Sequence, residues 1–158
     1  MKVMKILLML VMAGSMFFTT QAYSVEVLVD PEPVLVPEGM ELNKIAEGIK
    51  RGMSRRGWQV GKEEPGKIVA VLSIRNNKHI VKETITYNKQ HVQIKYLDSY
   101  NMDYQMGTPG SSMEDEYGFN NSRHSGNSDV PVPMIHRKYN SWVKNLAADI
   151  KQELFFQN

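Results

Sequence analysis

The chain has 158 residues, of which 19 are basic and 17 acidic, and it contains no cysteine. A chain of this length can bury a sizeable core without cross-links, and the lack of cysteine excludes both disulfides and a lipid-modified N-terminal cysteine. The small excess of positive charge argues against a protein that holds nucleic acid or an anionic membrane surface by electrostatic attraction.

Residues 1–24 have the composition of a cleavable secretory signal. Two lysines near the start precede an apolar run over residues 6–18, and a small-residue exit then allows cleavage after Ala22 or Ser24. The run is shorter than the roughly 20 apolar residues of a membrane span, so we expect no stable membrane anchor after cleavage. Cleavage removes both lysines and leaves 17 basic against 17 acidic residues. We therefore expect a near-neutral product that is periplasmic or secreted.

Residues 25–40 form a lead-in to the single α+β domain that we expect over residues 41–158. Three prolines in this lead-in exclude a helix or an interior strand. After Glu41 the apolar residues recur at helical spacing, which predicts an amphipathic helix over residues 41–56. Gly57 suits the C-cap position, where a left-handed backbone conformation ends the helix.

Residues 58–98 alternate between apolar and polar side chains and carry turn residues at intervals, which predicts an antiparallel meander. Asn76-Asn77 is a candidate for a two-residue turn, because asparagine tolerates positive φ, and Asn88-Lys89 is another. The expected strands are residues 58–60, 67–75, 78–87 and 90–98.

Residues 99–133 are rich in glycine, serine and asparagine and have little to bury, so we expect a mobile loop. Pro133 opens a second amphipathic pattern, which predicts a C-terminal helix. Each helix is apolar on one side, and a meander needs one of its faces covered. The predicted fold class is therefore α+β, with a four-stranded antiparallel meander sheet and an N-terminal and a C-terminal helix packed on one face.

The expected register of the sheet gathers polar side chains on the helix-covered face. With two-residue turns His79 lies opposite Asp98, and the C-terminal helix brings His136 and Asn140 towards this pair. Such a cluster could serve a histidine–carboxylate proton relay, a metal site of two histidines and a carboxylate, or a hydrolytic site that recruits Ser99. The same residues could instead hydrogen-bond one another and only hold the loop and the helix end against the sheet.

A series of short motifs runs through residues 45–155. It begins with a helix that ends in Arg-Gly-Trp, a Pro-Gly turn and a strand that closes on arginine. An alternating strand headed by histidine, a Tyr-x-Asp-Ser step and a helix that opens Ile-His-x-x-Tyr-Asn-x-Trp follow. In this chain the motifs are Arg56-Gly57-Trp58, Pro65-Gly66, Arg75, residues 79–87, Tyr96-Leu97-Asp98-Ser99, and Ile135 to Trp142.

This series resembles a group of small uncharacterised exported bacterial proteins, many of them lipoprotein-like. The chain departs from the group because it lacks the lipoprotein cysteine and carries what looks like an insertion over residues 107–129. The resemblance implies no established activity. The polar signature positions that it implies are Arg75, His79, Asp98, Ser99, His136 and Asn140.

We take these six residues as candidate ligand-binding residues and assign no catalytic residue, metal ligand or cofactor. We expect Glu83, which falls on the same face, at a sheet margin or beside a basic residue. The leading hypothesis is a non-enzymatic envelope or secreted binding module, because a long loop often carries recognition and no nucleophile or metal-ligand motif occurs. The alternatives are a small hydrolase or metal-binding protein that uses His79, Asp98 and His136, and an inhibitor of an envelope-attacking enzyme. The expected partner is an unknown envelope protein or ligand, and no oligomeric state is indicated.

Overall fold

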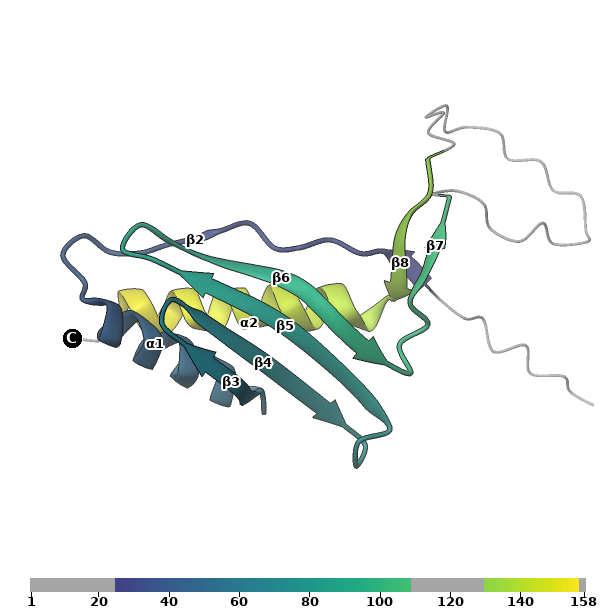
Figure 1. Cartoon of the computed structure of the whole chain (residues 1–158), viewed down its shortest axis with the longest axis horizontal. Coiled ribbons are helices and arrows are strands. Elements are labelled where there is room, and N and C mark those ends of the chain that lie inside the picture. Colours follow the sequence, from purple (N-terminus) through teal and green to yellow (C-terminus); the bar gives the residue numbers. More distant parts are fainter. Residues whose placement is uncertain (1–24, 109–129, 157–158) are drawn as a thin grey trace, which may run out of the picture.

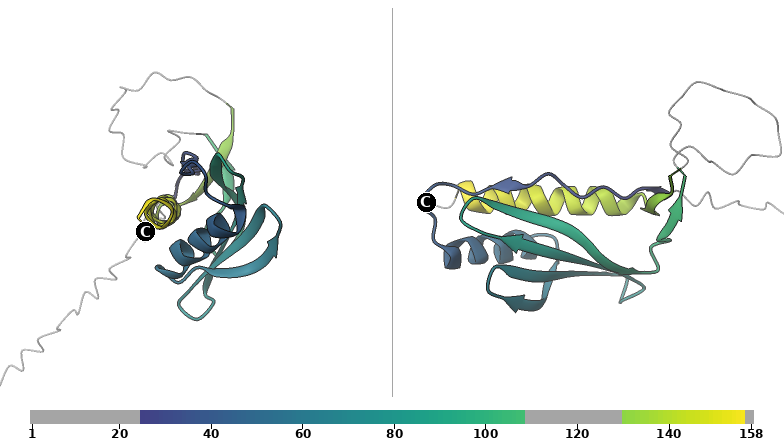
Figure 2. Two further views of the ribbon diagram at one scale, coloured as in Figure 1. Left: turned by 90° about the vertical axis from the view of Figure 1, so that its left-hand side faces the viewer. Right: turned by 45° about the horizontal axis from the view of Figure 1, so that its top comes forward.

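The computed structural model describes residues 25–108 and 130–156, so the predicted signal segment and much of the predicted loop lie outside the described residues. The fold is α+β, with a five-stranded and a three-stranded antiparallel sheet and two helices. Figure 1 shows the three-stranded sheet at one end of the larger sheet. The end-on view in Figure 2 shows both helices on the same face of the larger sheet.

The five-stranded sheet contains the predicted meander and one strand more. Its strand order is β2-β6-β5-β4-β3. The prediction of a single four-stranded sheet was wrong, because part of the lead-in pairs with β6 at the sheet edge: Val34 lies opposite Val92, and both side chains are buried. Prolines on either side of this strand keep it short and suit an edge position. The bounds are β2 Val34–Leu35, β3 Gln59–Glu64, β4 Lys67–Ile74, β5 His79–Tyr87 and β6 His91–Tyr100.

The turn between β4 and β5 forms as the sequence predicted. Asn76 and Asn77 have φ values of 54° and 66°, which matches a type I′ hairpin turn. Ile74 consequently lies opposite His79, and Ala70 lies opposite Glu83.

The register between β5 and β6 differs from the prediction by two residues, because the turn lies one residue further along the chain. The Asn88 side-chain oxygen accepts the backbone N–H groups of Gln90 and His91, so the turn closes around Lys89-Gln90. Ile85 therefore lies opposite Ile94 and not opposite Val92. A shift of two residues keeps each side chain on its predicted face, because the side-chain period of a strand is two.

The three-stranded sheet forms where the sequence predicted a loop and the start of a helix. Its strand order is β1-β8-β7, with β1 Val25–Val27, β7 Gln105–Gly107 and β8 Val132–His136. The prediction that Pro133 opens the helix was wrong: Val132–His136 finds backbone partners on two sides, and the helix begins after it. Residues 109–129 of the predicted mobile loop lie outside the described residues.

The helices α1 (Leu42–Ser54) and α2 (Lys138–Phe155) run antiparallel and in close contact. Two glycines of α1 set this separation: a Cβ on Gly52 would lie 2.8 Å from the Ile150 Cα, and one on Gly48 would lie 2.8 Å from the Leu154 Cδ2. Three residues past Ser54, the last residue of α1, the chain turns away at Gly57, which has φ +77°. The Trp58 N–H donates to the Met53 carbonyl and the Gly57 N–H to the Ser54 carbonyl, which is a Schellman motif.

The core lies between the helices and the inner face of the larger sheet. Fully burying each large apolar side chain here is worth roughly 1.5–3 kcal/mol relative to exposure. The sheet contributes Ile68, Ala70, Val81, Ile85, Val92 and Ile94, and the helices contribute Ile45, Ile49, Tyr139, Val143, Leu146 and Ile150. Over residues 25–108 and 130–156, neither helix is both long and apolar enough to cross a membrane.

Candidate functional site

A β-bulge near the end of β6 decides which polar side chains meet. Tyr96 lies opposite Glu83 and Asp98 lies opposite Lys82, so Leu97 is an extra residue with no partner on β5. A bulge of this kind re-aims the residues that follow it. Without the bulge the period of two would turn Asp98 towards the helices. With it, Ser99 takes the inward position opposite Val81, and Asp98 points to the open face.

The prediction that His79 lies opposite Asp98 was wrong, because the two-residue register shift at the β5–β6 turn moves Asp98 away from His79 and the bulge then places it opposite Lys82. Asp98 instead forms an ion pair with Lys82, with 2.8 Å between Nζ and Oδ2. The hydrogen bond from Lys82 lowers the pKa of Asp98. The His79 ring turns to the backbone, with its Nδ1 2.7 Å from the Asn101 carbonyl oxygen, so Nδ1 must carry a proton in that contact.

The remaining predicted site residues have local structural contacts. The His136 Nδ1 accepts the Lys138 N–H at the start of α2. Asn140 holds the first described residues against α2, because its Nδ2 donates to the Val27 carbonyl and its Oδ1 accepts the Val29 N–H. Arg75 lies exposed in the β4–β5 turn with φ 53°. The two histidines do approach the same turn, since the His136 N–H donates to the carbonyl of Met102, next to Asn101.

The turn after β6 is built around one buried methionine. Met102 is 2% exposed, and its neighbours Asn101 and Asp103 have φ values of 56° and 52°. Asparagine and aspartate are the non-glycine residues that adopt this left-handed conformation most readily. The Met102 side chain thus anchors the turn in the core and leaves the polar side chains of Asn101 and Asp103 at its rim.

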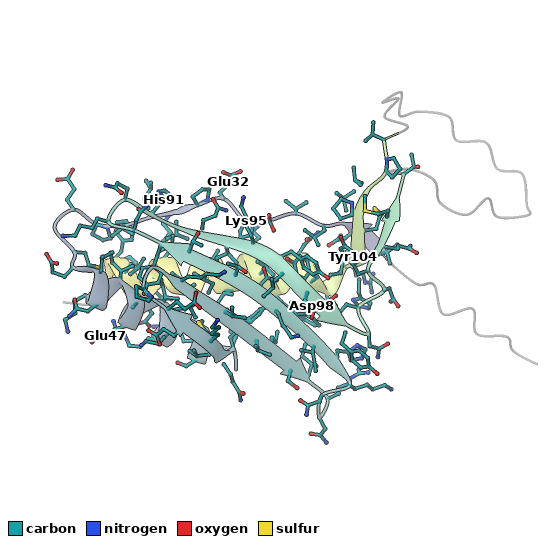
Figure 3. The ribbon with its side chains drawn as sticks, in the orientation of Figure 1. Glu32, Glu47, His91, Lys95, Asp98 and Tyr104 are labelled. Atoms are coloured by element: carbon teal, nitrogen blue, oxygen red, sulfur yellow. The ribbon has the colours of Figure 1, made fainter. Side chains whose placement is uncertain are left out.

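An open pocket of about 550 Å³ lies between the bulge and this turn. One wall is a pair of tyrosines: the rings of Tyr96 and Tyr104 are stacked with 5.0 Å between centroids and 7° between planes. Figure 3 shows Asp98 and Tyr104 at this end of the larger sheet, next to the three-stranded sheet. The pocket is lined by Tyr96, Leu97, Asp98, Ser99, Asn101, Met102, Asp103 and Tyr104.

Hydrogen bonds fix the polar side chains on one side of the pocket. The hydroxyl groups of Tyr96 and Ser99 lie 2.9 Å apart, and the Asn101 Nδ2 donates to the Lys78 carbonyl. Asp103 differs, because its carboxylate has no hydrogen bond or ion pair with any described residue. The pocket therefore combines an aromatic wall, positioned polar groups and one uncommitted carboxylate.

Behind Tyr96 lies a buried polar group that the sequence prediction misplaced. Glu83 is 0% exposed, in the core beneath the helices, and not at a sheet margin or beside a basic residue. Burial raises the pKa of Glu83 to about 8; the nearby Tyr139 hydroxyl opposes this rise and the Asp30 carboxylate adds to it. Glu83 is therefore protonated at neutral pH.

The neighbours of Glu83 connect it to the pocket wall. The Tyr139 ring packs edge-on against the Tyr96 ring, with 5.8 Å between the ring centroids. The Tyr96 N–H donates to Asp30 Oδ1. Tyr139 is close enough to influence the pKa of Glu83, yet neither Glu83 oxygen nor the Tyr139 hydroxyl reaches hydrogen-bond geometry with a described residue. Burial is also the main cause that raises the pKa values of Tyr96 and Tyr139. The alternation of Val81, Glu83 and Ile85 on one face was the signal that could have placed Glu83 in the core.

Two further observations bear on the chemistry of this site. Within the described ranges, no three histidine or acidic side chains lie close enough together to hold a metal ion. Comparison with protein-family models, curated proteins and solved structures gives no match to this chain. The assignment of a site therefore rests on the residues and their geometry.

Proposed function

We propose that the chain is an exported, non-enzymatic binding module and that its ligand binds in the pocket beside Tyr96 and Tyr104. The observation that carries this proposal is the stacked tyrosine pair on the wall of an open pocket. Aromatic rings beside a few positioned polar groups are the usual make-up of a recognition site. The pocket also lies where a bulged strand enters a turn, a common place for binding residues.

Export enters the proposal from the N-terminal sequence. An apolar run with a basic start and a small-residue exit is what a secretory signal requires. The motif series supports the same address, because the group that it resembles consists of small exported bacterial proteins. We infer from both that the binding partner belongs to the cell envelope or to the surroundings of the cell.

The geometry favours binding over the relay that the sequence suggested. A histidine–carboxylate relay needs the carboxylate within hydrogen-bond reach of the ring. The bulge instead pairs Asp98 with Lys82, and the His79 Nδ1 contacts a backbone carbonyl. Asp98 and Ser99 of the six candidate residues line the pocket, while His79, His136 and Asn140 support the structure around it.

The test is an amide chemical-shift titration of the purified protein with solubilised envelope extract. We expect shifts centred on residues 96–104. Tyr104→Ala should weaken them strongly because it removes the outer ring of the stack. Tyr100→Ala is the matched control, since Tyr100 is an exposed tyrosine nearby that does not line the pocket. Shifts elsewhere, or equal losses in the two variants, would contradict the proposal.

A further inference from the structure

We propose that the pocket recognises a cationic group, either a guanidinium or an ammonium, held between the exposed face of Tyr104 and the carboxylates of Asp103 and Asp98. This inference rests on the proposed function, because it names the class of ligand for the same pocket.

The pocket has more free hydrogen-bond acceptors than free donors among its described residues. Some side-chain donors of the pocket are in use: one proton of the Asn101 Nδ2 goes to a carbonyl, and the hydroxyl groups of Tyr96 and Ser99 bond to each other. Only one proton of that hydroxyl pair remains to donate. The second Nδ2 proton and the Tyr104 hydroxyl have no acceptor among the described residues. Among the described residues the larger free capacity is on the acceptor side, in the Asp103 carboxylate and the Asn101 Oδ1, whereas the Asp98 carboxylate is engaged by Lys82 and by the Ser99 backbone. A ligand that matches these groups must be rich in donors.

The aromatic wall of the pocket also favours a cation. Tyr96 covers one face of the Tyr104 ring, and Tyr104 remains 47% exposed. The face of an aromatic ring carries negative electrostatic potential and attracts a cation by about 0.5–1 kcal/mol at an exposed site. A planar guanidinium can stack on the ring and donate to a carboxylate at the same time.

The described residues that line the pocket carry negative charge, which favours a cationic ligand. Among the described residues, two aspartates and no basic side chain line the pocket. Lys82, which is half-buried, already neutralises Asp98 from the neighbouring strand. A ligand cation would therefore compete with Lys82 for Asp98, whereas no side chain of the described ranges pairs with Asp103. This gives the proposal an unusual signature, because removal of a positive side chain should strengthen binding.

The experiment is the same amide titration with three defined probes: an acetylated tetra-arginine amide, spermidine and a neutral chito-oligosaccharide. We expect both cations to shift the amides of residues 96–104. Asp103→Asn should weaken the affinity for tetra-arginine about threefold, the size of one exposed charge pair. Lys82→Gln should strengthen it about twofold because Asp98 is released. Raising the salt concentration from about 50 to about 500 mM should weaken binding severalfold.

Glu47→Gln is the matched control, since it removes one negative charge from α1 at the opposite end of the molecule (Figure 3). Tighter binding of tetra-arginine than of spermidine would point to peptide side chains as the source of the cation, and the reverse to free polyamines. An unchanged affinity in Asp103→Asn, or oligosaccharide binding that salt does not affect, would overturn the cationic class. If envelope extract shifts residues 96–104 and neither cation does, this inference fails while the proposed function stands.

Discussion

Two buried acids of this protein, Glu153 and Glu83, lie in opposite environments. Glu153 on α2 is 7% exposed and receives the Arg51 Nε at 3.1 Å and the Arg55 Nε at 2.6 Å, both from α1. Glu83 on β5 is 0% exposed and has no hydrogen-bond partner among the described residues. One acid is held by two cations, and the other keeps its proton.

The difference teaches that burial alone does not set the charge state of an acid. A buried charge is tolerated when its partners and hydrogen bonds replace the lost hydration, and otherwise the group shifts its pKa and becomes neutral. The helix–helix contact supplies partners because the arginines near the end of α1 reach across to α2. At the sheet–helix contact burial keeps Glu83 protonated; the Asp30 carboxylate adds to this effect and the Tyr139 hydroxyl opposes it.

The largest expected effect is the pH response of Glu83. Its folded pKa of about 8 lies above the ordinary value of 4.5. Between these values the unfolded chain has lost the proton that the folded chain keeps, so stability falls as the pH rises through this window. Glu83→Gln mimics the neutral acid and should abolish this slope. We expect the free energy of unfolding of Glu83→Gln to exceed that of the wild type by on the order of 3 kcal/mol at about pH 9. At about pH 5 the two values should differ little.

The measurement is urea unfolding at several pH values. The control is Glu63→Gln, which changes an exposed acid on β3 paired with Lys50. A wild-type slope that survives in Glu83→Gln would show that other groups cause it.

The second effect concerns the helix contact that brings the arginines to Glu153. Gly52→Ala should lower the free energy of unfolding by about 2 kcal/mol, because its Cβ meets the backbone of Ile150 and forces the helices apart. Gly48→Ala is the matched control, because its Cβ meets only the end of the flexible Leu154 side chain. In a helix interior, alanine is more favourable than glycine by about 1 kcal/mol. Equal losses in chemical denaturation of the two variants would contradict this account.

The smallest expected effect is a loss of stability in Glu153→Gln, opposite in sign to the gain expected for Glu83→Gln. Glu153→Gln makes the same chemical change as Glu83→Gln but removes the partner of Arg51 and Arg55. We expect a loss of about 1 kcal/mol at neutral pH, reduced at high salt, because the arginines are partly exposed. Thermal unfolding at low and high salt measures it, with Glu38→Gln, at an exposed acid outside both helices, as the control. A gain in stability would mean that the ion pairs do not stabilise the fold.

Much of the fold could be predicted from the sequence because its signals are local. The period of apolar residues defined both helices and the four strands of the meander. Gly57 ended α1 as predicted, and Asn76-Asn77 set the register between β4 and β5. Each of these features depends on residues that are neighbours in the chain.

The candidate site was predicted only in part, because it depends on a bulge. Nothing in Tyr96-Leu97-Asp98-Ser99 indicates which residue will lack a partner. The bulge moved Asp98 from the helix-covered face to the open face, and together with the two-residue register shift at the β5–β6 turn it removed the predicted histidine–aspartate pair. The pocket joins Asp98 and Ser99, which were predicted, to Tyr104 and Asp103, which were not.

Sequence alone was enough to predict the α+β class, the two amphipathic helices, the β4–β5 register and the inward faces of β4, of β5 and of β6 as far as its bulge. These features follow from side-chain periodicity and turn preferences, which act over a few residues. The added strand β2, the three-stranded sheet, the pocket and the charge states of Glu83 and Glu153 became clear only from the tertiary structure. Those features arise from segments far apart in the chain, such as β1 with β8 and Arg55 with Glu153. Which distant groups meet depends on the packing of the whole chain, and that packing determines whether a buried acid finds a cation or keeps its proton.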